Sequence, residues 1–134
     1  MPRSLRTFLI DGSNAVYAVF GPWPETLKEQ NRCAWDFISA LNDWVLSAPE
    51  FSIELVFDGF YREIPAVNRE RLRVIFSDEA KADSIILERI RSLIYFKEKV
   101  TLVTRDQDLA QEARRENAKI LDPQKFWSMI SRPL

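Results

Sequence analysis

The stretch FLIDGSNAVYA, residues 8–18, decides the fold because an apolar run stops in it abruptly on a carboxylate. The segment 7–10 is typical of a strand that is buried on both faces, as in a parallel sheet. Asp-Gly-Ser-Asn follows at 11–14, and Asp-Gly is a favourable turn dipeptide. Taken alone, the stretch fits a tight turn as well as a site at the end of a strand, so the rest of the chain must separate the two.

The segments after this stretch alternate between helices and strands. Residues 12–25 are expected to form a loop, in which Pro22 and Pro24 exclude a helix and Trp23 is exposed. Apolar residues at steps of three and four predict a helix over about 26–46. Further strands are predicted to end at Asp58, Ser77, Thr104 and Leu121, and further helices to span about 79–96, 109–117 and 122–130. This order predicts an α/β fold with a Rossmann-like, mostly parallel five-stranded sheet and helices on both faces, in a single domain over residues 1–134.

Composition is that of one globular domain: 134 residues, of which 46% are apolar and 29% charged. The net charge of −1 argues against a protein that coats nucleic acid by bulk charge, although a local basic patch remains compatible with it. There is no apolar run of about 18 residues, and the N-terminal residues do not resemble a signal peptide. With Cys33 as the single cysteine, these features predict a cytoplasmic protein with no membrane partner.

The absence of histidine from the chain excludes several kinds of active site. Neither a Ser-His-Asp triad nor a Cys-His pair can be built, and neither can RNA cleavage that uses histidine as acid and base. A zinc site of cysteine and histidine is excluded as well. Carboxylates must therefore carry the reaction if the protein is a hydrolase, alone or with a hard metal ion.

Four aspartates follow the predicted strands at one edge of the sheet. Asp11 follows the first strand, Asp58 the second, and Asp106 and Asp108 the fourth. Ligands of parallel α/β sheets bind outside these carboxyl ends. Each aspartate also has a purely structural interpretation, since Asp58 precedes a glycine and Asp106 or Asp108 could cap the next helix. The functional interpretation therefore rests on the set.

Asp83 is a fifth candidate, in the predicted middle helix. Its spacing places it on the same face as the apolar residues Ile86, Leu87, Ile90 and Ile94. A charge on a buried face is costly unless it is paired, which favours a functional role. The alternative is an acid in the first turn of the helix, where the helix dipole favours it. That alternative weakens if Ser77 or Asp78 caps the helix.

Converging carboxylates repel one another, and a divalent cation removes the conflict. Mg²⁺ or Mn²⁺ prefers such oxygen ligands and could activate a water for attack on a phosphodiester. Asn14 could hold a metal-bound water or a phosphate oxygen, or it could satisfy the backbone of the turn. The candidates for phosphate contacts are Arg62, Arg69, Arg71, Lys81 and Arg105. The stretch 59–73, rich in arginine and including Phe60 and Tyr61, fits a stacking loop or an ordinary solvated loop.

Four segments of the chain together resemble a known family. LIDGSN (9–14), VFDG (56–59), VIFSDEAKADSII (74–86) and VTLVTRDQDLAQEARRENA (100–118), in that order, resemble the YacP-like branch of the NYN domains, which belong to the PIN-like nucleases. The most specific parts are Asp-Gly-x-Asn, Ala-Asp-x-x-Ile and Thr-x-Asp.

The resemblance implies a compact Rossmann-like fold with an acidic metal pocket, and endoribonuclease activity with Mg²⁺ or Mn²⁺. It implies RNA as the substrate, and one branch of the family is linked to cleavage of mRNA on ribosomes. Carried over by position, Asp11, Asp83 and Asp106 match the metal-binding triad, Asn14 matches the family's asparagine, and Asp108 is a candidate fourth ligand. Ser13, Ser84 and Arg105 depart from the family pattern. The missing second acid at Ser84 leaves the number of metal ions open.

The same residues allow four other interpretations, of which two require a different fold and two the same fold. A von Willebrand A-type metal site needs a serine where Ala15 stands, and a phosphate-accepting receiver domain needs paired acids at the first strand. A PIN-type toxin would use the same chemistry under a partner antitoxin. The serious alternative is a catalytically silent RNA-binding module on the same fold, which would bind RNA without a divalent metal. DNA as substrate also stays open, since metal-activated water needs no 2′-hydroxyl.

Overall fold

A five-stranded sheet forms the centre of the computed structural model, which describes residues 6–22 and 24–131. Trp23, expected to be exposed, lies outside these residues. The strands are β1 (Arg6–Asp11), β2 (Phe51–Phe57), β3 (Leu72–Phe76), β4 (Lys99–Val103) and β5 (Lys119–Leu121). Their order is β3-β2-β1-β4-β5 and every pair is parallel, so the predicted α/β fold is confirmed and the sheet is parallel throughout.

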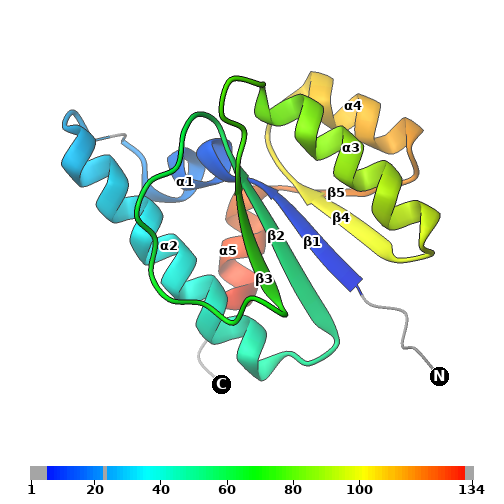
Figure 1. Ribbon diagram of the computed structural model, residues 1–134, viewed down its shortest axis with the longest axis horizontal. Helices are drawn as coiled ribbons and strands as arrows, with labels where there is room; N and C mark the ends of the chain where they lie inside the picture. The colour runs from blue at the N-terminus through cyan, green and yellow to red at the C-terminus, as the bar shows by residue number, and fades with distance from the viewer. Residues whose placement is uncertain (1–5, 23, 132–134) are drawn as a thin grey trace.

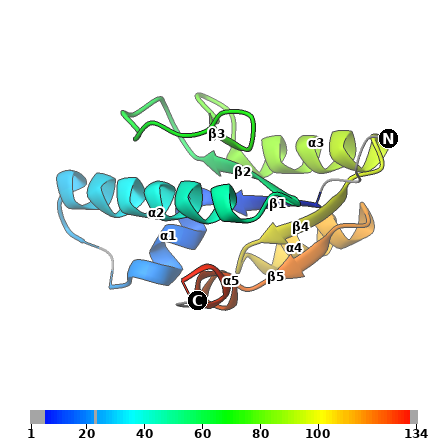
Figure 2. The ribbon, with the colours of Figure 1, turned by 90° about the horizontal axis from the view of Figure 1, so that it is seen from below.

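Helices cover both faces of the sheet, as Figure 1 and Figure 2 show. They are α1 (Gly12–Phe20), α2 (Leu27–Ser47), α3 (Ala82–Tyr95), α4 (Gln107–Arg115) and α5 (Pro123–Ile130). The first, second and fifth helices bury their apolar residues against one face, around Phe8, Phe37 and Phe126. The third and fourth helices cover the other face, around Leu9 and Ile86. Adjacent residues of β1 therefore serve opposite cores, which explains its unbroken apolar sequence.

Helix α1 lies where the sequence predicted a loop, so that prediction was wrong. Its first residues, Gly12 to Asn14, are typical of a turn and led to the prediction of a loop. The apolar residues that follow, Ala15, Val16, Val19 and Phe20, have the spacing of one helix face. Ala15 and Val16 are buried, while Val19 and Phe20 pack against the same core. Burial of this one face stabilises a helix that the turn residues alone would not favour. The helix ends at Phe20, before Gly21 and Pro22.

Helix α3 begins at Ala82, three residues later than predicted, with Lys81 at its N-cap. Ser77 is instead engaged with the neighbouring loop, because its hydroxyl accepts a hydrogen bond from the Gly59 amide at 2.9 Å. Other predicted boundaries are confirmed: Pro123 occupies the first turn of α5. Asn117 has a φ of 72°, the left-handed conformation expected after α4.

The strand order creates a switch point between β1 and β4. From β1 the chain first crosses to β2 on one side, and later returns to β4 on the other side. The carboxyl ends of these two strands carry Asp11 and the segment after Val103, so the crevice expected for ligands in this kind of sheet lies there. Within the described residues, no helix is long and apolar enough to cross a membrane.

Gly12 allows α1 to start directly against the neighbouring strand. A Cβ atom at this position would lie 2.8 Å from the carbonyl oxygen of Val56 and 2.8 Å from the ring of Phe57. Backbone atoms of β2 cannot move away cheaply, so only glycine fits this close approach. The glycine of the Asp-Gly-x-Asn motif thus sets the position of Asp11 and Asn14 at the edge of the sheet.

Candidate active site

Asp11 is the most buried carboxylate at this edge, with 6% of its surface exposed. Its Oδ2 accepts a hydrogen bond of 2.9 Å from the Thr104 hydroxyl, at the end of β4. Burial raises the pKa of Asp11 to about 6; the Thr104 bond opposes this rise, and the negative charges of Asp83, Asp58 and Asp106 add to it. Asp11 is thus a destabilised carboxylate among other carboxylates, a situation that marks functional sites more often than structural ones.

Thr104 connects the two strand ends, a role that the sequence analysis did not assign to it. Its hydroxyl donates to Asp11 and accepts a hydrogen bond of 3.1 Å from the backbone amide of Asp106. The side chain is buried, so both bonds are shielded from water. The Thr-x-Asp motif was the available signal, and only the pairing of β1 with β4 reveals its partner.

Asp106 is the N-cap of α4, as its structural interpretation anticipated. Its Oδ1 accepts hydrogen bonds from the backbone amides of Asp108 and Leu109, at 3.0 and 3.1 Å. The capping bonds fix the orientation of the carboxylate, whose charge acts on both Asp11 and Asp83. Capping and membership of the acidic cluster are therefore compatible. Asp108 is exposed in the first turn of the same helix.

Asp83 is exposed, so the expectation that it lies on the buried face of its helix was wrong. Because α3 begins at Ala82, this aspartate lies in the first turn, where the dipole favours it. It still belongs to the cluster: its pKa is raised by partial desolvation and by the charges of Asp106, Asp58 and Glu112, while Lys81 lowers it. Glu112 of α4 is a member that the sequence analysis missed, because helix packing alone brings it near α3.

Asp58 and Asn14 hold the surrounding loops in place. Asp58 Oδ1 accepts a 3.0 Å hydrogen bond from the backbone amide of Ala82 and so tethers the start of α3 to the end of β2. Asn14 Oδ1 accepts one of 2.8 Å from the backbone amide of Arg105. The Asn14 oxygen thus satisfies a backbone group of a distant loop, rather than of its own turn.

The predicted phosphate-binding residues separate into two groups. Arg105 pairs with Asp122 at 2.9 Å, and Arg71 donates to the carbonyl oxygens of Ala48 and Phe51. Arg71 is therefore a structural residue that fixes the turn before β2. The others lie open to solvent or nearly so: Lys81 and Arg69 are exposed, and Arg62 lies half-buried over the rings of Phe57 and Phe76, each 5.5 Å from its guanidinium carbon.

The residues at this edge suit a hard divalent cation in chemistry and in charge. The acidic donors are carboxylate oxygens; desolvation, with mutual repulsion added to it, raises the pKa values of Asp11 and Asp83, and a cation would offset both effects. Over residues 6–22 and 24–131, however, no three acidic or cysteine side chains are gathered closely enough to hold one ion. The arrangement is a cluster of negative charges in which Asp11 is buried and Asp83 and Asp108 are exposed.

Taken together, the parallel sheet and the cluster of acidic residues at its switch point define an α/β domain with a candidate site at the carboxyl edge of the sheet. The chain belongs to the YacP-like NYN domain family, whose model matches residues 8–133. This membership supports a nuclease-like function related to RNA.

Two solved structures have the same fold. A crystal structure of the W164L mutant of Rae1 (YacP) from Bacillus subtilis has a TM-score of 0.73 and 18% sequence identity, covering 94% of this chain and 75% of that one. A second structure of Rae1 from the same organism has a TM-score of 0.64 and 19% identity, with 94% and 74% covered. No curated protein sequence matches the chain.

Proposed function

We propose that this protein is an endoribonuclease that depends on Mg²⁺ or Mn²⁺ and cuts RNA at the carboxyl edge of the sheet. The observation that carries the proposal is the state of Asp11, a buried carboxylate whose pKa is raised to about 6 amid three further negative charges. A fold has no structural reason to keep such a group, because a buried unpaired charge lowers stability. Asp11, Asp83 and Asp106 would hold the metal ion, with Asp108 and Asn14 assisting.

In the proposed reaction, some residues of the chain would bind the metal ion and others would orient these ligands or contact the phosphate. When bound, the divalent ion would supply a Lewis acid that neutralises phosphate charge and lowers the pKa of a water. Thr104 orients the Asp11 carboxylate through its hydroxyl, and the capping bonds orient Asp106. The Asn14 amide can donate a hydrogen bond to a phosphate oxygen. Since the chain has no histidine, these oxygen ligands and amides are the groups available for the reaction.

A groove rich in cations, with an aromatic side chain, supports RNA as the substrate. It has a volume of about 330 Å³, and its lining includes Lys28, Arg32 and Trp35 of α2, together with Arg62 and one acid, Glu63. Arg62 also donates a 3.1 Å hydrogen bond to the carbonyl oxygen of Asp58, so the groove begins next to the acidic cluster. Cations that alternate with an exposed indole suit the phosphates and bases of a single strand. Lys81, exposed at the N-cap of α3, would extend the same contacts, whereas Arg69 lies before β3 at the opposite, amino edge of the sheet.

One observation favours the second candidate, a silent RNA-binding module. In the part of the chain that the structure describes, the acidic residues do not form a preassembled group of three around one point. Such a module would bind RNA through the same groove and would need no divalent ion. The two functions therefore make opposite predictions about metal dependence.

Cleavage of a mixed single-stranded RNA in Mn²⁺ tests the proposal. We expect cleavage by the unaltered protein, and loss of cleavage in EDTA and in Asp83→Asn. Asp43→Asn serves as the matched control, since Asp43 is an exposed aspartate of α2 outside the acidic cluster. Cleavage that survives Asp83→Asn would refute the assigned site. RNA binding without cleavage of free RNA or of ribosome-associated mRNA, the substrate that the family resemblance implies, would establish the silent module.

A further inference from the structure

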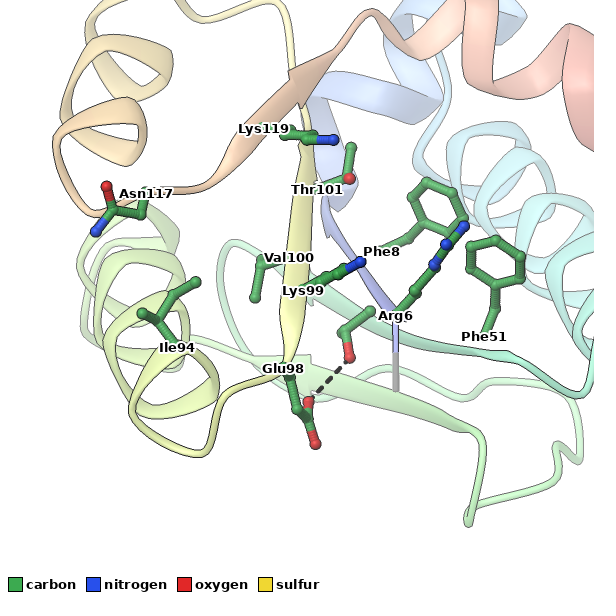
Figure 3. Close-up of a pocket in the computed structure, with 11 residues that line it drawn as sticks. Arg6, Phe8, Phe51, Ile94, Glu98, Lys99, Val100, Thr101, Asn117 and Lys119 are labelled. Carbon is green, nitrogen blue, oxygen red and sulfur yellow. Dashed lines mark hydrogen bonds between the residues drawn. The ribbon is translucent and has the colours of Figure 1, made fainter. Parts of the chain in front are cut away.

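A second basic pocket lies at the opposite, amino edge of the sheet (Figure 3). Its volume is about 490 Å³, and its lining includes Arg6 of β1, Lys99 of β4 and Lys119 of β5. These three strands are neighbours in the sheet. Arg6 is thus separated from Asp11 by the length of β1, about 17 Å over five residue steps.

The three cations lie on the same face of the sheet. Arg6 is paired in register with Lys99, and two residues further along, Phe8 is paired with Thr101, which is paired with Lys119. Side chains of paired residues point to the same face, and so do side chains two residues apart. Like charges that are neighbours across strands destabilise a sheet. An anion in the pocket would reverse the sign of that contribution.

Nothing in the described ranges neutralises these cations. The ion pairs there are Arg89–Glu54, Arg91–Glu116 and Arg105–Asp122, and none of them involves Arg6, Lys99 or Lys119. Glu98 is the one acidic residue in the lining, and its Oε2 accepts a hydrogen bond of 3.1 Å from the Thr7 hydroxyl. Because Thr7 precedes Phe8, its side chain points to the other face of β1. The dashed line in Figure 3 marks this bond, which directs the Glu98 carboxylate away from the cations.

The width of the row of cations indicates what kind of anion the pocket takes. Its inner wall is apolar, where the half-buried Phe51 stacks on the core residue Phe8 with ring centroids 5.1 Å apart at an interplanar angle of 15°. Cations over two strand spacings span about 10 Å, which is wider than one phosphate group. Several phosphates in a row match this width better than a single inorganic anion.

We propose that the amino-edge pocket formed by Arg6, Lys99, Lys119, Phe8 and Phe51 is a second RNA-binding site, which holds the backbone of a single strand away from the acidic crevice. The proposal depends on the proposed function only for the identity of the polyanion as RNA. An RNA long enough to reach around the domain would engage both edges, whereas a tetranucleotide would engage one.

The double variant Lys99→Gln/Lys119→Gln tests the site, because both side chains are exposed and neither contributes to a core. Binding is measured in EDTA by fluorescence anisotropy, with a single-stranded RNA of about 20 nucleotides, a length that exceeds one typical binding site. The matched control is Arg115→Gln/Lys125→Gln, which removes the same charge from two exposed residues of α4 and α5 that line neither this pocket nor the groove beside α2. We expect about tenfold weaker binding for the pocket variant, less for the control, and a salt dependence reduced by about one ion for the pocket variant.

The outcomes separate this proposal from the nuclease proposal. Equal weakening in both double variants would mean that bulk charge alone acts, and would overturn the pocket as a site. The pocket would also be overturned as a site if the pocket variant bound RNA as tightly as the unaltered protein, or if the unaltered protein bound no RNA. The same holds if the variant bound a free nucleoside triphosphate more weakly but RNA equally well. Selective weakening in a protein that cuts no RNA would support this pocket and refute only the nuclease. Cleavage of a tetranucleotide should be equal in the pocket variant and the unaltered protein.

Discussion

Replacement of Asp11 by asparagine should make the folded protein more stable at neutral and alkaline pH. Burial raises the pKa of this carboxyl from 3.8 to about 6. One pKa unit corresponds to about 1.4 kcal/mol, so ionisation of Asp11 costs the folded state about 3 kcal/mol relative to the unfolded chain. Asparagine keeps a carbonyl oxygen that can accept the Thr104 hydrogen bond, and it carries no charge to desolvate.

The pH window follows from the direction of the shift. A carboxyl whose pKa is higher in the folded state contributes stability that is fully present below pH 3.8 and is lost as the pH rises through about 6. Linkage assigns about 1.4 kcal/mol of that loss to the interval from pH 5 to pH 8. For a domain of this size, this amounts to a relative change of about 5 °C in melting temperature. Urea unfolding of both proteins at several pH values measures it directly.

The expected result is a stability difference, Asp11→Asn minus unaltered protein, that grows by about 1.4 kcal/mol between pH 5 and pH 8. Mn²⁺ should stabilise the unaltered protein at pH 8 and have less effect on the variant. Asp43→Asn controls for the general removal of a negative charge from an exposed position. A difference that is flat with pH, or that shrinks as the pH rises, would refute the reasoning from burial.

Three further predictions concern residues that hold the sheet and its helices together. Gly12→Ala should destabilise the protein by about 2 kcal/mol in urea unfolding, because the new Cβ would lie 2.8 Å from the backbone of β2; a neutral effect would contradict the close approach. Arg89→Met should cost about 3 kcal/mol, since it strands the buried Glu54 carboxylate that Arg89 holds at 2.6 and 2.8 Å; adding Glu54→Gln should recover much of the loss. Thr104→Val should lower both RNA cleavage and stability, by about 1–2 kcal/mol for the latter, whereas Thr104→Ser should keep both; equal behaviour of the two variants would exclude the hydroxyl as the cause.

The amino-acid sequence determined the fold class and the edge at which the acidic residues gather. An unbroken apolar run such as residues 7–10 predicts a strand that is covered on both faces of the sheet. It can be recognised from that segment alone, without information on the rest of the chain. Parallel strands all end at one edge of the sheet. The sequence therefore predicted that Asp11, Asp58 and Asp106 lie at the same edge, without the order of the strands being known. The order of strands was not needed for that inference.

Tertiary structure decided which groups contact one another. The Thr104–Asp11 bond spans 93 residues and exists because β4 pairs with β1, a choice that no local pattern encodes. Helix α1 forms because its apolar face finds a core, against the turn propensity of its own first residues. Asp83 is exposed because α3 starts at Ala82, where the Asp58 carboxylate from a distant loop accepts its first amide hydrogen bond. Periodicity in the sequence reports which residues can be buried, whereas long-range packing and hydrogen bonds determine where each helix starts and which side chains meet at the site.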